Sequence, residues 1–130
     1  MKNSEHKTIF IVDDNDLSRH LLRSILRDGP VRLIGEAIDG ERALLTIGKL
    51  RPDIVCLDIV MPGINGIETL KEIKAQFPRT IVLMISAEPR GEVVKQAIAH
   101  GAAGFVVKPF NAARVLDSIG RAVSVFDSAS

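Results

Sequence analysis

The stretch Ile54-Val55-Cys56-Leu57-Asp58 decides how this sequence folds, and Ile59-Val60-Met61-Pro62-Gly63 follows it directly. Its first four residues form a short apolar run that is typical of a buried strand. Asp58 closes the run, although aspartate is rarely buried unless it is paired or binds a ligand. Packing does not explain a carboxylate at this position. We therefore expect Asp58 to be a functional residue around which the chain is organised.

Four other apolar runs share the shortness and the Ile and Val content of this one, and longer helical patterns separate them. The five runs are Thr8–Val12, Val31–Ala37, Ile54–Leu57, Thr80–Ile85 and Gly104–Val107. Their starts are about 23 to 26 residues apart, the length of a strand, a helix and two loops. This alternation predicts an α/β fold, a parallel sheet with five helices on both faces. The second run carries Arg32 and Glu36, which suits a sheet edge, so the flavodoxin-like strand order 2-1-3-4-5 is expected.

Start and stop signals delimit the five helices. The first begins near Asn15 or Asp16, the second at Asp39, the third at Asn65, the fourth after Pro89 and the fifth after Asn111. In the third, Asn65 can cap the helix while Glu68 reaches back, as in a capping box. The first helix places Leu17, Leu21 and Ile25 in one row, with Leu22 and Leu26 beside it. The apolar residues expected to face the core from the second helix are Ala43, Leu44, Ile47 and Leu50, and those from the third are Ile67, Leu70, Ile73 and Phe77. The fifth helix should bury a subset of Val115, Leu116, Ile119, Val123 and Phe126.

The composition is that of an ordinary globular protein. The 130 residues, 46% hydrophobic and 25% charged, suit one domain over 1–130 with a core at 7–126 and polar tails. The 17 basic and 16 acidic side chains nearly cancel, whereas a nucleic-acid interface needs a basic excess. Cys56 is the single cysteine, which excludes a cysteine zinc site and is compatible with a reducing compartment. The first apolar run is too short for a signal peptide or membrane span, so we expect a cytoplasmic protein.

Polar residues suited to one chemistry follow four of the five runs. Asp13 and Asp14 follow the first, Asp58 the third, Ser86 the fourth and Lys108 the fifth. Because parallel strands all end at the same edge of the sheet, these side chains should meet there. Singly, each has a simpler explanation: Asp13 and Asp14 suit a helix start, Asp58 a turn, Ser86 a helix cap and Lys108 a solvated surface. Their combination favours a shared site.

Three carboxylates in one place repel one another and raise one another's pKa. A bound Mg²⁺ removes this conflict, because it takes oxygen ligands, and an ammonium such as that of Lys108 adds a second positive charge. Such a site suits phosphoryl transfer, in which catalysis consists mainly of positioning and charge neutralisation. An aspartate can itself be the nucleophile and form an aspartyl phosphate.

Four motifs resemble the signature stretches of receiver domains of two-component response regulators, in particular those of the stand-alone, chemotaxis-regulator type. They are Ile11-Val12-Asp13-Asp14, 58–66 (Asp-Ile-Val-Met-Pro-Gly-Ile-Asn-Gly), Met84-Ile85-Ser86-Ala87 and Val107-Lys108-Pro109-Phe110. The resemblance covers about residues 7–126. It implies phosphorelay signalling by a protein that catalyses only its own phosphorylation and dephosphorylation and is otherwise not an enzyme.

The resemblance also assigns roles to residues. Asp58 would accept a phosphoryl group from a phosphohistidine on a sensor kinase or phosphotransfer protein. Asp14, Asp58 and the backbone carbonyl of Val60 would hold Mg²⁺, for which Mn²⁺ can substitute, and Asp13 would act through water. Lys108 would bind the phosphoryl oxygens.

Further roles concern the response to phosphate. The bond from Lys108 to Pro109 would be cis, Ser86 would donate its hydroxyl to the phosphoryl group, and Phe105 would turn inward when Ser86 moves. The fourth helix, fifth strand and fifth helix would then bind a downstream protein, with the chain a monomer or a phosphorylation-dependent dimer. Val60 and Glu88 match variable positions beside the phosphate, and Val60 would slow the attacking water to give moderate dephosphorylation.

Three other interpretations compete with this one. A phosphatase of the haloacid dehalogenase type would need a second acid two residues after the nucleophile, where this chain has Val60. A flavodoxin-like nucleotide or flavin binder would need a glycine-rich loop after the first strand, where the acidic segment 13–16 would repel phosphate. An interaction module that has lost phosphate acceptance would not need the complete set of site residues that is present.

Overall fold

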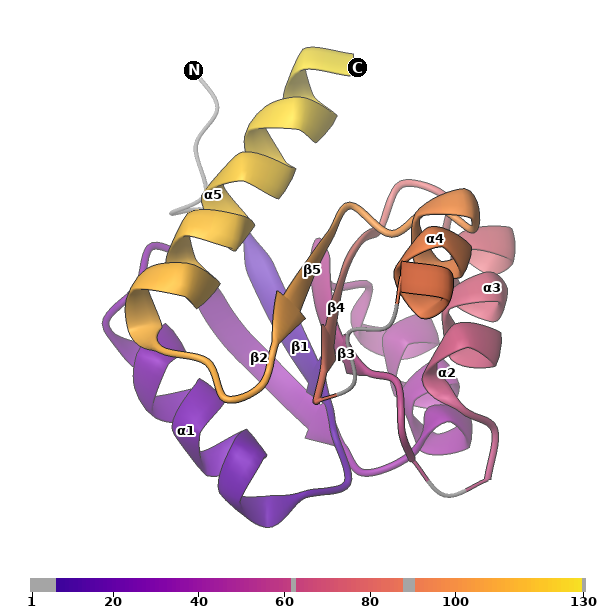
Figure 1. Cartoon of the computed structure of the whole chain (residues 1–130), viewed down its shortest axis with the longest axis horizontal. Coiled ribbons are helices and arrows are strands. Elements are labelled where there is room, and N and C mark those ends of the chain that lie inside the picture. Colours follow the sequence, from indigo (N-terminus) through magenta and orange to yellow (C-terminus); the bar gives the residue numbers. More distant parts are fainter. Residues whose placement is uncertain (1–6, 62, 88–90, 130) are drawn as a thin grey trace.

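The computed structural model describes residues 7–61, 63–87 and 91–129, the side chains of 126–129 excepted. Its elements alternate strictly between strand and helix (Figure 1). They are β1 (Thr8–Val12), α1 (Asp16–Arg27), β2 (Arg32–Ala37), α2 (Gly40–Leu50), β3 (Ile54–Asp58), α3 (Gly66–Gln76), β4 (Ile81–Ser86), α4 (Gly91–Ala99), β5 (Gly104–Val107) and α5 (Ala112–Ala129). The predicted α/β class is therefore confirmed, with strand bounds that differ by one residue at most.

The five strands form one parallel sheet in the order β2-β1-β3-β4-β5, as predicted. Strand β2 lies at an edge, while β1, β3 and β4 lie inside and are almost wholly buried. The register pairs Val12 of β1 with Leu57 of β3, and Asp58 with Ile85 of β4. The carboxyl ends of these central strands consequently lie next to one another at one edge of the sheet.

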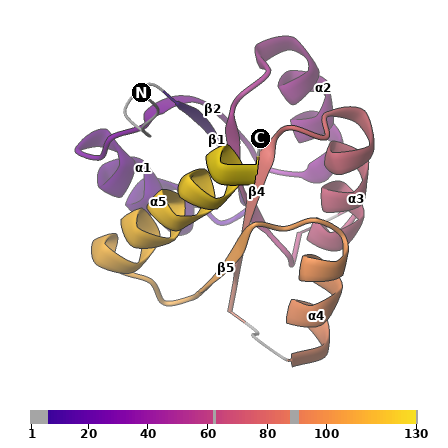
Figure 2. The same cartoon turned by 90° about the horizontal axis from the view of Figure 1, so that it is seen from above.

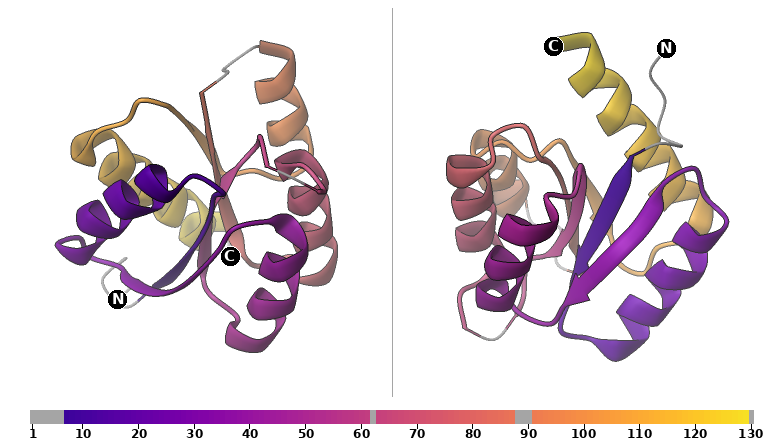
Figure 3. Two further views of the ribbon diagram at one scale, coloured as in Figure 1. Left: turned by 90° about the horizontal axis from the view of Figure 1, so that it is seen from below. Right: turned by 180° about the vertical axis from the view of Figure 1, so that it is seen from behind.

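The sheet separates two apolar cores, and each core is closed by its own set of helices. Helices α1 and α5 cover one face, and α2, α3 and α4 cover the other (Figures 1 and 2). Leu22, Leu26, Val115 and Ile119 fill the first core, and Ala43, Ile47, Leu70 and Ile73 fill the second. Figure 3 shows the same layers from below and from behind. Strands β1, β3 and β4 contribute alternate side chains to both cores, which is why they are apolar throughout.

Three helices begin next to the capping residues that the sequence predicted. Asn15, Asp39 and Asn65 each cap a helix by accepting a hydrogen bond from a backbone N–H three residues on. The predicted capping box at Asn65 is only half formed, because the Glu68 carboxylate pairs with Lys71 instead. Helix α2 ends at Leu50, and its C-cap residue Arg51 has a left-handed φ of 50°.

Most of the predicted core residues that the structure describes are buried or partly buried, and Leu50 is the exception on the second, third and fifth helices. In the apolar row of α1, Leu17 is 65% and Leu21 44% exposed, and the core is filled instead by Leu22 and Leu26 beside them. Leu50 is 44% exposed although it lies over the edge strand β2, where its Cδ1 would stand 3.3 Å from a Cβ built on Gly35. Leu44, Ile67, Phe77 and Leu116 are partly buried against the cores. Pro89, the predicted first-turn residue of α4, and the Phe126 side chain lie outside what the structure describes.

Candidate functional site

The turn after β1 carries two carboxylates with different surroundings. Asp13 is 1% exposed. Its backbone N–H donates to the Ala37 carbonyl at 3.1 Å, and its Oδ1 accepts from the Asn15 N–H at 2.9 Å. Asp14, the next residue, is exposed. One carboxylate is thus fixed inside the edge of the sheet, and its neighbour reaches solvent at the same place.

Asp58 is the last residue of β3 and is 5% exposed. The chain after it returns sharply, so that the Gly66 N–H donates to the Ile59 carbonyl at 2.7 Å. A Cβ on Gly66 would stand 2.2 Å from the Asp58 carbonyl oxygen, which no side chain tolerates. Helix α3 therefore begins directly against the backbone of Asp58 and holds the end of β3 in place.

Lys108 joins the two strand ends. Its Nζ lies 3.0 Å from Asp13 Oδ2 and 3.3 Å from Asp58 Oδ2. Its backbone N–H donates to the Ser86 carbonyl at 2.8 Å, which fixes the lysine beside the end of β4. The Lys108–Pro109 bond is cis, as the sequence motif implies. Ser86 is fully buried, so residues that follow β1, β3, β4 and β5 meet in one place.

Burial and repulsion act on the Asp58 carboxyl group. Burial raises its pKa, the Asp13 carboxylate raises it further, and the Lys108 ammonium opposes both, so that the pKa of Asp58 reaches about 6. Burial acts to lower the pKa of Lys108, but its hydrogen bonds and the two carboxylate charges outweigh burial and raise it. Asp58 is consequently still mainly ionised at neutral pH, and Lys108 remains an ammonium.

The three aspartates fit a divalent cation. Oxygen atoms of Asp13, Asp14 and Asp58 all lie within 4.8 Å of one another, and a single lysine is too little charge to balance three carboxylates. A hard, oxygen-binding cation suits this donor set, with Asp14 open to solvent on the side from which an ion can approach. The Val60 side chain is 65% exposed beside the site. Glu88, the other variable position, lies outside the described residues.

Phe105, the predicted switch residue, lies on β5 and packs partly buried against the core under α2, α3 and α4. Between the β3–α3 loop and α4 there is a cavity of about 570 Å³ whose lining includes Val60 and His100. Apolar side chains also reach the surface on the adjoining elements: Ile98 of α4 is 52% exposed and Val107 of β5 38%. The fold thus brings the predicted switch residue and the predicted output surface together on one side.

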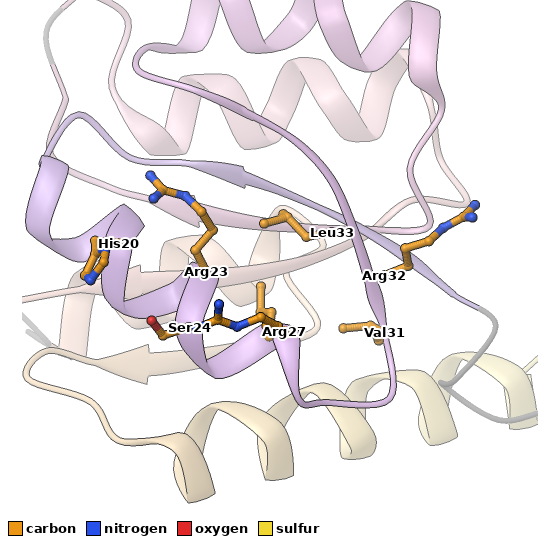
Figure 4. A pocket seen from close by; sticks show the side chains of 8 residues that line it. His20, Arg23, Ser24, Arg27, Val31, Arg32 and Leu33 are labelled. Atoms are coloured by element: carbon orange, nitrogen blue, oxygen red, sulfur yellow. The ribbon is translucent and has the colours of Figure 1, made fainter.

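A second hollow, of about 480 Å³, lies between α1 and β2 and contains none of the acidic residues. Its lining includes Arg23, Arg27 and Arg32, but Figure 4 shows the guanidinium groups of Arg23 and Arg32 leaving in different directions. They do not converge on a point where an anion could sit. This hollow therefore adds nothing to the acidic site.

Sequence reasoning missed two residues of the site. Gly66 appeared only as part of a motif, because the close approach of α3 to Asp58 depends on tertiary structure. Arg19 was not singled out, although its Nη1 donates to the Asp13 carbonyl oxygen at 2.8 Å. A basic residue in the second turn of the helix that follows Asp13-Asp14 was the available signal.

The family follows from a match over most of the chain. The model of the family described as "Response regulator receiver domain" matches residues 9–120, a range that contains all the site residues described above. The chain belongs to the response regulator receiver family. Its members are phosphorylated on aspartate in two-component signalling, and this decides against the phosphatase and flavin-binder interpretations. A receiver of this type is a signalling protein and not a conventional enzyme.

Two curated relatives match the receiver over nearly their full length. Protein CcdB of Bacillus subtilis is 41% identical over 113 residues, which cover 87% of this chain and 94% of the relative. Chemotaxis protein CheY of Listeria monocytogenes is 40% identical over 114 residues, which cover 88% of this chain and 96% of the relative. The similarity is therefore to small, CheY-like receivers.

Solved structures agree with the fold. The "CheX-CheY-BeF3-Mg+2 complex from Borrelia burgdorferi" contains a chain with a TM-score of 0.86 and 35% identity, over 92% of this chain and 89% of that one. NtrX from Brucella abortus has a TM-score of 0.88 and 35% identity, over 95% of this chain but 28% of its own. Within the described parts of this receiver, no helix is both long enough and apolar enough to cross a membrane.

Proposed function

We propose that this receiver accepts a phosphoryl group on Asp58 from a phosphohistidine of a sensor histidine kinase or a histidine phosphotransfer protein, in a Mg²⁺-dependent reaction. The observation that supports this most directly is the Lys108 ammonium, which lies 3.0 Å from Asp13 and 3.3 Å from Asp58 across two strand ends. With Asp14 beside them, these groups provide a nucleophile, a metal-binding pair and a fixed positive charge.

In the proposed reaction, a carboxylate oxygen of Asp58 attacks the phosphorus atom of the donor. The new O–P bond forms as the P–N bond to the donor histidine breaks, and the departing imidazole nitrogen keeps the electron pair and takes up a proton. Lys108, freed from its pairing with Asp58, binds a phosphoryl oxygen. Asp58 must be ionised to attack, and a pKa of about 6 leaves it so at neutral pH.

Asp14, Asp58 and the backbone carbonyl of Val60 are the proposed metal ligands, with Asp13 acting through water. The Mg²⁺ ion, for which Mn²⁺ can substitute, supplies charge neutralisation for the transferring phosphoryl group. The similar CheY of Borrelia burgdorferi, solved as a complex with BeF3 and Mg²⁺, supports Mg²⁺ as the ion.

The signal is proposed to leave through α4, β5 and α5. The Ser86 hydroxyl turns to the phosphoryl group, the loop after β4 follows, and Phe105 moves inward into the space that is freed. Exposed Ile98 and Val107 make this surface suitable for a protein partner. The partner itself is unidentified; the CheY of Borrelia burgdorferi was solved in complex with CheX. The receiver is proposed to be a monomer or a phosphorylation-dependent dimer.

By similarity to CheY-like relatives of nearly the same length, we further propose that residues 7–126 act as one receiver domain in the cytoplasm, through protein contacts and not through DNA. Exposed Val60 is proposed to hinder the attacking water and so to give the phosphorylated form a moderate lifetime.

Incubation with acetyl phosphate and Mg²⁺, followed by intact-mass measurement, tests the proposed chemistry. The wild-type protein should gain the mass of one phosphoryl group, and Asp58→Asn should gain none. Asp117→Asn, which removes an exposed carboxylate from α5, is the matched control and should behave as wild type. A wild-type protein that gains no mass would instead indicate a module that no longer accepts phosphate, and steady turnover of a phosphomonoester would indicate a phosphatase.

A further inference from the structure

Arg19 is a nearly buried arginine next to the acidic site. It lies in the second turn of α1, and its side chain is only 12% exposed. Its guanidinium donates to the Asp13 carbonyl oxygen at 2.8 Å through Nη1 and pairs with the Asp16 carboxylate through Nη2. Its Nε lies 3.4 Å from Glu36 Oε1. Every part of the planar fork therefore has a partner.

The contact with Asp13 is made to the peptide group that leads into Asp14. The Asp13 carbonyl and the Asp14 N–H belong to one planar unit, so a bond that fixes the carbonyl also fixes the direction in which Asp14 leaves it. On the other side of the residue, the Asp13 N–H is held by the Ala37 carbonyl at 3.1 Å. The backbone of Asp13 is thus held by β2 before its Cα and by Arg19 after it.

Neighbouring acids balance the charge of Arg19. Glu36 also pairs with Arg23, whose Nε lies 2.5 Å from Oε2 and whose Nη2 lies 3.2 Å from Oε1. Two arginines and the carboxylates of Glu36 and Asp16 therefore form a cluster with no net charge. This balance lets a guanidinium stand beside a cation site with little repulsion. Arg23, whose side chain is 47% exposed, shares Glu36 with Arg19, but its guanidinium bonds to that carboxylate and not to the Asp13 carbonyl.

We propose that Arg19 is a positioning residue for the metal site: it holds the Asp13-Asp14 turn in the form that presents both carboxylates to a divalent cation beside Asp58. This inference rests on the Mg²⁺ site of the proposed function. The loss of the Arg19 charge and the loss of its contact with Asp13 would change the affinity for Mg²⁺ in opposite directions. Loss of a nearby positive charge alone would strengthen Mg²⁺ binding, whereas loss of the positioning contact weakens it.

The test compares Arg19→Met with Arg23→Met, a matched loss of one Glu36 partner one turn away. Mg²⁺ is titrated into each protein, and the backbone amide shifts of Asp14 and Asn15 are followed by NMR. Arg19→Met should weaken Mg²⁺ binding about tenfold, the usual effect of losing a partner that orients a metal ligand. Arg23→Met should bind Mg²⁺ as wild type does, or slightly tighter. In the metal-free protein, the Asp13 N–H should exchange faster with solvent in Arg19→Met than in Arg23→Met.

Arg19→Lys keeps the charge but not the fork, and it serves as the second variant if Arg19→Met does not fold. It should also weaken Mg²⁺ binding, which a charge effect would not do. Equal or tighter binding in the Arg19 variants, or equal weakening in Arg19→Met and Arg23→Met, would overturn the positioning role. A wild-type protein whose amides do not respond to Mg²⁺ would overturn the proposed metal site itself, so the two failures are distinguishable.

Discussion

Replacement of Asp58 with asparagine should make the metal-free protein more stable at neutral pH. The carboxylate is almost buried and lies in one cluster with Asp13, and these two effects raise its pKa from 3.8 to about 6 despite Lys108. A rise of roughly two units, at ~1.4 kcal/mol per unit, corresponds to about 3 kcal/mol. The asparagine side chain in Asp58→Asn would carry no charge, and Lys108 would still have Asp13 as a partner.

The sign of the pH dependence follows from the same shift. The folded protein binds the Asp58 proton more tightly than the unfolded chain does, so stability is lost as pH rises from about 4 to about 6. The advantage of Asp58→Asn should therefore be full at pH 7 and fall below about 1 kcal/mol at pH 4. Addition of Mg²⁺ at 100 times its Kd should remove most of this advantage, because a ligand at that concentration stabilises the wild type by about 2.7 kcal/mol.

Urea unfolding in the presence of a chelator measures this effect. The chain has no Trp and no Tyr, so far-UV circular dichroism is the suitable signal. Asp117→Asn is the control, since it removes a carboxylate from an exposed ion pair with Arg121, of a kind that contributes at most about 1 kcal/mol. If Asp58→Asn is no more stable than the wild type at pH 7, or if its gain in stability is as large at pH 4, then burial of the ionised Asp58 next to Asp13 does not destabilise the folded protein.

Three further outcomes can be checked with simple variants or reagents. Burial raises the pKa of the Cys56 thiol to about 12. The thiol should therefore resist alkylation in the native protein and react fully in denaturant, which mass spectrometry would show. Rapid labelling of the native protein would contradict the burial of Cys56. Gly66→Ala should destabilise the fold by about 3 kcal/mol, because the new Cβ meets backbone atoms. Gly120→Ala, with nothing within 4 Å of its Cβ, should instead stabilise α5 by up to about 1 kcal/mol. Equal unfolding midpoints for the two variants would refute the close approach of α3 to Asp58. Ser86→Ala should still be phosphorylated but change its α4–β5–α5 surface less, and partner binding that remained equally phosphate-dependent would disprove the coupling.

The sheet and the acidic cluster could be predicted because both follow from simple rules. Apolar runs at a regular spacing predicted the strands, and the shared end of parallel strands brought Asp13, Asp58 and Lys108 together. Leu50 was predicted wrongly because an apolar pattern does not reveal that a side chain over the edge strand β2 stays open to solvent on one side. Arg19 was not found because a long side chain that reaches a carbonyl leaves no periodic trace in the sequence.

The site residues lie far apart in the sequence, which matters while the chain is being synthesised. Lys108 lies 95 residues after Asp13 and 50 after Asp58, its two partners. Synthesis proceeds from the N-terminus, and a domain generally folds as one unit. A nascent chain that ends before β5 carries all three aspartates without the ammonium that draws two of them together. The complete site therefore forms only after the last strand has been made, and under the proposed function a chain that ends before it would lack the ammonium that binds the phosphoryl group.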